Sequence, residues 1–185
     1  MSTTPTILTV SGSLRANSSN NIVIETITRL MAGHARFVQY DGIGALPHFD
    51  DSKEPGPEVL RWRKAISDAD GILICSPEYA FGVPGSLKNA LDWTVSSGEL
   101  VYKPLALITA ATGGDKAHAA LLHTFTALSC RIPEEGKLLV SFIRSKMDAA
   151  GNITDEATLH SLETVITALL QEIREVADTA VTDAS

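Results

Sequence analysis

The chain has 185 residues, 44% of them hydrophobic and 20% charged, which is enough for one domain with a full hydrophobic core. Its formal net charge of −7 argues against a protein that attracts nucleic acid or anionic membranes through broad basic charge. We therefore expect a single domain over residues 1–185, with an ordered core from about 5 to 176, and no nucleic-acid or membrane partner.

We expect a cytoplasmic location, because the sequence shows no targeting signal and its cysteines suggest no disulfides. The first residues lack the basic and apolar segments of a signal peptide, and no apolar run approaches the roughly 20 residues of a membrane-spanning helix. The two cysteines, Cys75 and Cys130, form no CxxC pair and imply no disulfide framework. Cys75 lies inside an apolar run, which is typical of a buried structural thiol.

The N-terminal part of the chain predicts two strands around a helix. Thr6 to Val10 is rich in β-branched residues and predicts a strand, and a polar turn follows from Ser11 to Ser19. Apolar residues then recur at helical spacing until Gly33, which ends the predicted helix. A second strand is predicted from Arg36 to Tyr40.

The middle of the chain continues this alternation. Asp41 to Pro57 is rich in proline, glycine and aspartate and predicts a loop, and a helix follows from about Glu58 to Ser67. Gly71 to Cys75 is a continuous apolar run, as expected for a parallel strand buried on both faces. After the loop Ser76–Val83, Pro84 is expected to open a helix that runs to about Ser96.

The C-terminal part adds two strands and two helices. Pro104 to Ala111 predicts a strand that leads through the turn Thr112–Gly114 into a helix from Lys116 to Ser129. Leu138 to Ile143 predicts the fifth strand. We expect Thr154 to cap a last amphipathic helix, with Asp155 and Glu156 complementing its dipole, and the residues after about Ala177 to fray.

Five strands alternating with five helices predict an α/β fold with a parallel sheet covered on both faces. For this length we expect a doubly wound sheet of order 2-1-3-4-5. Ligands of such sheets bind outside the carboxyl ends of the strands, near the point where the strand order reverses. The loops 11–20, 76–83 and 112–114 should meet there.

The first of these loops, residues 11–20, favours phosphate binding. It is dense in hydroxyl groups, carries Arg15 and leads into a helix N-terminus, where unpaired N–H groups and the helix dipole attract anions. It is neither a P-loop nor a GxGxxG motif. The alternative interpretation is a capped turn with a surface arginine.

The other two loops are less specific. Tyr79 and Phe81 follow a buried strand and could stack beside a flat aromatic ligand, or could instead pack on the sheet edge or at a dimer contact. Gly113 and Gly114 let a ligand approach backbone N–H groups, but a tight turn has the same requirement.

The motifs and the histidine spacing of the sequence give little support to a hydrolase or to a metal site. The chain has no Gly-x-Ser-x-Gly elbow. His118 and His123 are five residues apart on a predicted helix and diverge, whereas metal pairs lie three or four apart. We expect all five histidines to be surface or hydrogen-bonded residues, and no metal site.

Two longer motifs resemble the NADPH-dependent FMN reductase family. The first is Gly12-Ser13-Leu14-Arg15-Ala16-Asn17-Ser18-Ser19-Asn20. The second is Pro77-Glu78-Tyr79 followed by Pro84-Gly85-Ser86-Leu87-Lys88-Asn89-Ala90-Leu91-Asp92-Trp93. The similarity extends over residues 6 to about 145, and it implies a flavodoxin-like fold.

The resemblance implies that FMN is the cofactor and that the flavin, with no catalytic side chain, carries the chemistry. It assigns the FMN phosphate to Ser11, Ser13, Arg15, Ser18, Ser19 and Asn20. It assigns the ribityl chain and ring to Pro77, Glu78, Tyr79 and the nearby backbone, with Ala80, Phe81 and Thr112 among the cofactor-binding residues, and the pyrimidine edge of the ring to Gly113 and Gly114. Tyr79 and Phe81 would form part of the nicotinamide or acceptor pocket. Many members have Asn where this chain has Ala80, so only a backbone contact is expected there. The helix Lys88–Trp93 should serve packing instead of cofactor binding.

The reaction implied by the resemblance is hydride transfer from NADPH or NADH to the flavin and on to a small acceptor, such as a quinone, free flavin, chromate or an azo compound. The alternative is a flavodoxin-type electron carrier that acts with protein partners, although the loop 11–20 lacks the flavodoxin Thr/Ser-x-Thr-Gly-x-Thr run. The family also implies a homodimer or homotetramer. The loop Asp41–Pro57, which contains Leu46-Pro47-His48-Phe49, is expected to expose apolar groups beside the site for such a contact.

Overall fold

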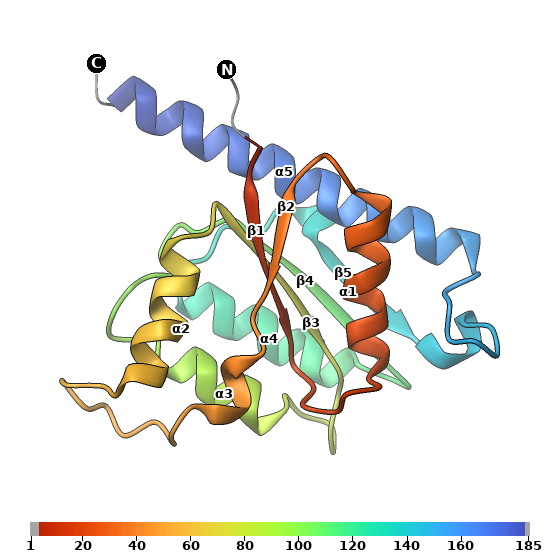
Figure 1. The fold of residues 1–185 in the computed structure, drawn as a ribbon, viewed down its shortest axis with the longest axis horizontal. Coiled ribbons are helices and arrows are strands. Elements are labelled where there is room, and N and C mark those ends of the chain that lie inside the picture. The colour runs from red at the N-terminus through yellow and green to blue at the C-terminus, as the bar shows by residue number, and fades with distance from the viewer. Residues whose placement is uncertain (1–3, 184–185) are drawn as a thin grey trace.

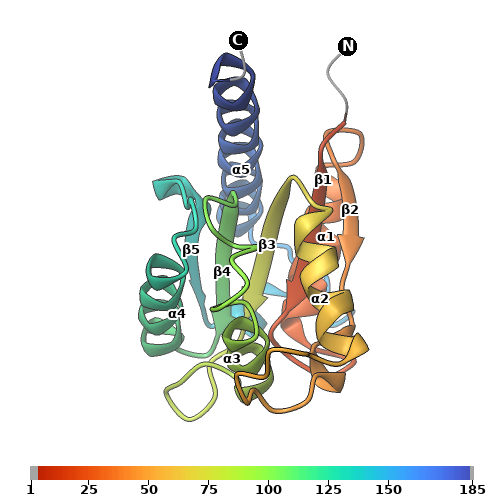
Figure 2. The same cartoon turned by 90° about the vertical axis from the view of Figure 1, so that its left-hand side faces the viewer.

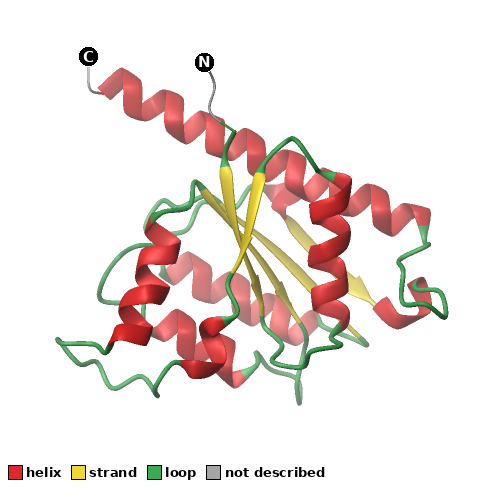
Figure 3. Cartoon of the chain, viewed as in Figure 1, coloured by secondary structure: helices red, strands yellow, loops and turns green. Residues whose placement is uncertain are grey.

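Five parallel strands form the centre of the structure, a computed structural model that describes residues 4–183 (Figures 1 and 3). The strands lie in the order β2-β1-β3-β4-β5, which confirms the predicted doubly wound topology. Their bounds are Thr6–Ser11 for β1, Arg36–Gln39 for β2, Gly71–Ser76 for β3, Leu105–Ala111 for β4 and Lys137–Ser141 for β5. Every residue of β3 and β4 is buried, as the continuous apolar runs predict.

Helices cover both faces of the sheet (Figure 2). One face carries α1 (Ser19–Leu30) and α5 (Glu156–Asp183), whose apolar residues form one core with the inward side chains of the sheet. The other face carries α2 (Pro57–Ser67), α3 (Gly85–Asp92) and α4 (Asp115–Ala127), which form a second core. Three short 3₁₀ helices complete the fold: η1 (Gly42–Ala45), η2 (Glu134–Gly136) and η3 (Ile143–Lys146).

The helix α3 is shorter at both ends than the sequence predicts. Pro84 has an extended ψ of 131° and is the N-cap, so the helix begins at Gly85. The helix ends at Asp92 instead of about Ser96, because the carbonyl groups of its last turn find partners outside the helix. The Nε and Nη2 atoms of Arg63 donate to the Trp93 carbonyl at 2.9 and 2.8 Å.

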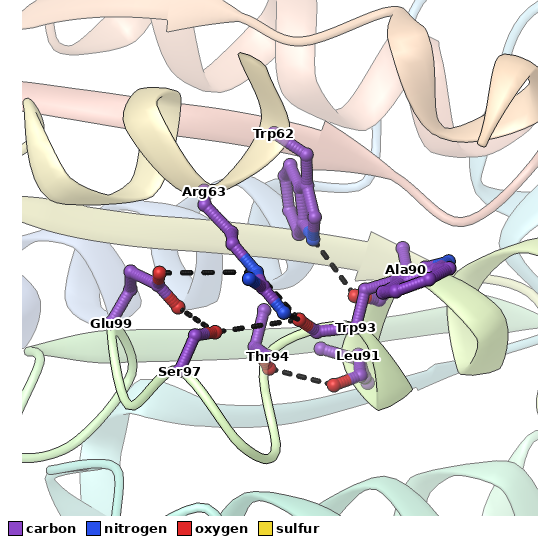
Figure 4. Close-up of polar contacts among 8 residues, drawn as sticks. All are labelled: Trp62, Arg63, Ala90, Leu91, Trp93, Thr94, Ser97 and Glu99. Carbon is purple, nitrogen blue, oxygen red and sulfur yellow. Dashed lines mark hydrogen bonds and ion pairs between the residues drawn. The ribbon is translucent and has the colours of Figure 1, made fainter. Parts of the chain in front are cut away.

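Figure 4 shows how α2 holds this end of α3. The Trp62 Nε1 atom donates to the Ala90 carbonyl at 2.8 Å, and the Arg63 guanidinium donates to the Trp93 carbonyl. The Ser97 hydroxyl donates to the Glu99 carboxylate, and its Oγ also lies 3.4 Å from Trp93 O. The other oxygen of the Glu99 carboxylate lies 4.0 Å from Arg63 Nε. Two adjacent residues of α2 thus satisfy carbonyl groups that α3 leaves unpaired.

The ends of β5 and α5 also differ from the predictions. Phe142 adopts a left-handed φ of 55°, which ends β5 at Ser141, and Ile143 begins η3. The cap of α5 is Asp155 instead of Thr154, since its carboxylate accepts from the Thr158 N–H at 2.9 Å. The helix continues to Asp183 instead of fraying after Ala177, while residues 184 and 185 lie outside the described part.

The loop between β2 and α2 packs inward. Leu46 is buried, and Phe49 lies edge-on against Trp93 with ring centroids 5.2 Å apart. Leu46 and Phe49 therefore do not supply the exposed apolar groups expected of this loop, whereas Pro47 is exposed. Between residues 4 and 183 no helix is long and apolar enough to cross a membrane.

Candidate functional site

The loop between β1 and α1 closes on itself through its own hydroxyl groups. Ser11 Oγ accepts from the Ser13 N–H at 3.3 Å, and Ser13 Oγ accepts from the Arg15 N–H at 3.3 Å. Gly12 is required by a close approach, because a Cβ there would lie 2.8 Å from Ser76 Oγ and 3.0 Å from Leu87 Cδ2. The loop is thus pressed against β3 and α3, which places its polar groups at the carboxyl edge of the sheet.

The helix α1 begins at this loop, and no acidic side chain of its first turn balances the positive end of its dipole. Ser18 is the N-cap, and its Oγ accepts from the Asn20 N–H at 3.2 Å. The first turn contains no acidic residue. The Arg15 guanidinium forms no hydrogen bond or ion pair with the described residues. A helix start of this kind, with a free cation beside it, suits an anion.

Glu78 closes the corresponding end of α4. Its Oε2 atom accepts from the N–H groups of Lys116 and Ala117, both at 2.9 Å. The carboxylate therefore occupies the N-terminal amides of α4 and ties the loop after β3 to that helix. Gly114, the N-cap of α4, has φ 110°, and a Cβ there would lie 2.7 Å from Leu139 Cδ1.

The loop after β3 forms a tight two-residue turn. Tyr79 and Gly82 exchange backbone hydrogen bonds at 3.0 and 2.9 Å, and Ala80 and Phe81 between them have φ of 48° and 60°. These angles indicate a type I′ turn. The Tyr79 hydroxyl lies 3.2 Å from Ser13 Oγ, which links this turn to the loop before α1.

A cavity of about 520 Å³ lies along this edge of the sheet, and we call it the edge cavity. Its volume falls in the range of about 300–1,000 Å³ that small-molecule sites occupy. Four loops contribute to its walls. Its lining residues are Ser13, Arg15, Asn17, Ser18, Ser19, Asn20, Pro77, Glu78, Tyr79, Ala110, Ala111, Thr112, Phe142, Ile143, Arg144 and Ser145.

The structure brings most of the predicted site residues to this cavity. Nine of the fourteen line it, and the five that do not are Ser11, Ala80, Phe81, Gly113 and Gly114. Ser11 lines a smaller cavity of about 190 Å³, which shares Ser13 and Arg15 with the edge cavity. The Asn20 side chain is turned into the protein, where Nδ2 donates to Ala110 O at 3.4 Å and Oδ1 accepts from Cys75 Sγ at 3.1 Å.

One wall of the cavity is formed by residues that the sequence did not predict for the site. Phe142, Ile143, Arg144 and Ser145 follow the fifth strand and lie at the same edge as the other loops. The rule that ligands bind at the carboxyl ends of strands would have found them. Extending the predicted strand to Ile143 concealed this loop.

The residues present fit a flavin mononucleotide. The start of α1 and Arg15 offer positive charge to a phosphate, and hydroxyl groups line the same cavity at Ser13, Ser18 and Ser19. A Cβ at Gly113 would meet nothing closer than Glu78 Oε1 at 3.5 Å, so its backbone is open to a ligand. Among the described residues no cluster of His, Cys, Asp or Glu could hold a metal ion.

This fold and cavity define a doubly wound α/β protein with its ligand site at the carboxyl edge of the sheet. Residues 5–144 match the NADPH-dependent FMN reductase family, and the chain belongs to that family. Its cofactor is therefore FMN and its electron donor NAD(P)H. The family match supports an oxidoreductase acting on a small-molecule acceptor and does not support the flavodoxin-type carrier.

Individual proteins that are similar to this chain are named as reductases or oxidoreductases. A 2-hydroxy-1,4-benzoquinone reductase of Burkholderia sp is 36% identical over 166 residues, which cover 85% of this chain and 90% of that protein. A quinone reductase of Escherichia coli K12 is 28% identical over 180 residues, covering 92% and 96%. The solved structure of FerB, a flavoenzyme NAD(P)H:(acceptor) oxidoreductase from Paracoccus denitrificans, superimposes with a TM-score of 0.81 at 27% identity, covering 92% of this chain and 98% of FerB.

Proposed function

We propose that this chain is an NAD(P)H-dependent quinone reductase that holds FMN in the edge cavity. The observation that carries the proposal is that the start of α1, with Arg15 beside it, opens on the same cavity as the Tyr79 turn. The phosphate would lie at residues 13–20, and the ring would lie toward Pro77–Tyr79 and Thr112. Ser11, Ala80, Phe81, Gly113 and Gly114 would shape these loops or contact FMN through the backbone.

When bound, FMN supplies the hydride chemistry, and the protein supplies position and electrostatics. The Ser18 cap orders the first turn of α1, and Glu78 holds the loop after β3 against α4. The hydrogen bond between Ser13 and Tyr79 fixes the distance between the phosphate loop and the aromatic turn. These contacts preorganise the cavity, so little binding energy is lost in ordering it.

The proposed acceptor is a quinone. Two similar proteins are named for quinone reduction, one of them for a hydroxylated benzoquinone. Tyr79 and Phe81 are exposed beside the cavity, and Phe81 is 80% exposed. Flat aromatic surfaces of this kind can stack on a nicotinamide or on a quinone ring. Chromate, azo compounds and free flavin are further candidates, to be compared in the same assay.

We also infer one domain over residues 1–185, a cytoplasmic location and a homodimer or homotetramer. The oligomer is supported by exposed apolar side chains near the cavity, on Leu14, Phe81 and Phe142. Light scattering at micromolar concentration should give a mass of two or four chains. A monomer would contradict this inference without affecting the proposed activity.

The visible spectrum of the purified protein tests the function. We expect an oxidised flavin spectrum that is lost on adding NADPH or NADH and restored by a benzoquinone. The Arg15→Ala variant should lose FMN on dialysis, whereas Arg174→Ala, on the exposed face of α5, should retain it. Protein that binds FMN but oxidises neither dinucleotide in the presence of quinone would contradict the proposal.

A further inference from the structure

The described lining of the edge cavity contains two arginines, and Arg144 lies outside both sequence motifs. Arg144 belongs to η3, and its side chain is exposed. Like that of Arg15, its guanidinium forms no hydrogen bond or ion pair with any residue that the structure describes. Both cations are therefore available to a ligand.

The position of Arg144 is set by a constrained corner. Phe142 holds a left-handed φ of 55°, which is rare for a bulky side chain and persists only where surrounding contacts impose it. Its N–H donates to Thr112 O at 3.2 Å, and Ser141 Oγ donates to Gly113 O at 3.0 Å. The Ser145 hydroxyl closes the corner by donating to Phe142 O at 2.8 Å. The corner is thus fastened to the loop after β4, which also lines the cavity.

The same segment packs beside the start of α1. A methyl group at Gly151, shortly after η3, would lie 3.7 Å from Cδ1 of Ile22, in the first turn of that helix. In the sheet, β3 and β4 lie between β1 and β5, so the two arginines that line the cavity come from loops after different strands. The acid in the lining, Glu78, is occupied by the amides of α4.

We propose that Arg144 is a cofactor-binding residue that, together with Arg15, holds the phosphate of FMN. This inference rests on the proposed function. A phosphate monoester carries a charge of about −1.5 to −2 at neutral pH, and one arginine with a helix end of about half a charge balances only the lower end of that range. A second guanidinium completes the neutralisation and can bind two phosphate oxygens at once.

Comparing FMN with riboflavin, which lacks the phosphate, tests this assignment. Each flavin is titrated into flavin-free full-length protein, and its dissociation constant is measured from the change in flavin fluorescence. Arg144→Gln should weaken FMN binding by about 10- to 100-fold and leave riboflavin binding within about twofold. Arg144→Lys should give an intermediate loss, because lysine keeps the charge but not the bidentate geometry.

The control is Arg174→Gln, which removes the same charge from the exposed face of α5 and should change neither constant. Unchanged FMN affinity in Arg144→Gln would overturn the assignment. An equal loss of affinity for both flavins would also overturn it. Unchanged FMN affinity together with a raised KM for NADPH, but not for NADH, would overturn it as well. Wild-type protein that binds neither flavin would contradict the proposed function itself, a result distinct from these.

Discussion

Ala80 and Phe81 carry the strain of the turn after β3. Both have positive φ, 48° and 60°, a conformation that costs an L-residue other than Gly, Asn or Asp roughly 1–2 kcal/mol. The turn nevertheless holds Phe81 out at 80% exposure beside the edge cavity. Asparagine, which the family resemblance associates with position 80, tolerates such a left-handed angle better than alanine does.

Ala80→Asn should stabilise the protein by about 1 kcal/mol, because asparagine tolerates the left-handed conformation better than alanine. Urea unfolding measures the change. The matched control is Ala119→Asn on the exposed face of α4, which should destabilise by roughly 0.5 kcal/mol through lower helix propensity. A loss of stability at position 80 would show that the turn is not strained.

His118 links stability to pH. Burial, and then the charge of Lys137, lower the pKa of His118 below its ordinary value, and its Nδ1 lies 2.9 Å from Thr109 Oγ1. A lowered folded-state pKa means that the unfolded chain takes up a proton first as the pH falls. The stability that neutral His118 contributes is therefore complete above its ordinary pKa and is lost as the pH falls through the folded value.

We therefore expect the urea midpoint of the wild type to fall more between about pH 7.5 and about pH 5.5 than that of His118→Gln. His123→Gln, on the exposed side of the same helix, is the control and should follow the wild type. Parallel curves for wild type and His118→Gln would show that His118 does not contribute to the pH dependence.

At the scale of elements, residues 84–93 of the second motif serve mainly to anchor a loop. Asn89 accepts from the Phe49 N–H at 2.8 Å and donates to Pro47 O at 2.9 Å. Trp93 Nε1 also donates to Pro47 O, at 2.8 Å. Leu87, Ala90 and Leu91 are buried in the core, as the sequence predicts. This part of the motif thus positions the loop before α2, and no side chain of α3 lines the edge cavity.

Asn89→Ala removes both hydrogen bonds to this loop and should cost roughly 1–3 kcal/mol, because the Phe49 N–H loses its partner. We expect faster proteolysis within residues 41–57 as well as a lower urea midpoint. Lys88→Ala on the same helix breaks only the exposed pair with Asp92 and should cost less than about 0.5 kcal/mol. Equal effects of the two variants would contradict the anchoring role.

At the scale of the molecule, two cores share one sheet. Leu169 on α5 is fully buried in one core, and the chain's two tryptophans, Trp62 and Trp93, lie in the other. Because β3 and β4 are buried on both faces, loss of packing on one side weakens the sheet that supports the other. We expect the two cores to unfold together.

Leu169→Ala should cost about 2–5 kcal/mol and shift the urea midpoint equally in tryptophan fluorescence and far-ultraviolet circular dichroism. Glu163→Ala, on the exposed side of α5, controls for the helix itself and should shift neither signal appreciably. A tryptophan transition that stays in place while the dichroism shifts would show that the cores unfold separately.

The sequence by itself determined the five strands, their order and the three loops that meet at the cavity. Apolar runs such as Gly71–Cys75 and Leu105–Ala111 are local patterns, and the alternation with helices leaves few topologies. The two motifs supplied the family, and with it the cofactor. Local chemistry and chain connectivity suffice for these conclusions.

Only the tertiary structure decided where elements end and what their polar groups bind. Arg63 holds the end of α3, Glu78 caps α4 and the left-handed Phe142 turns Arg144 toward the edge cavity. Glu78 and Arg63 meet partners about 30 to 40 residues away in sequence, and the corner at Phe142 bonds to the loop after β4. No local pattern encodes such pairings, because they form only when the folded sheet brings the segments together.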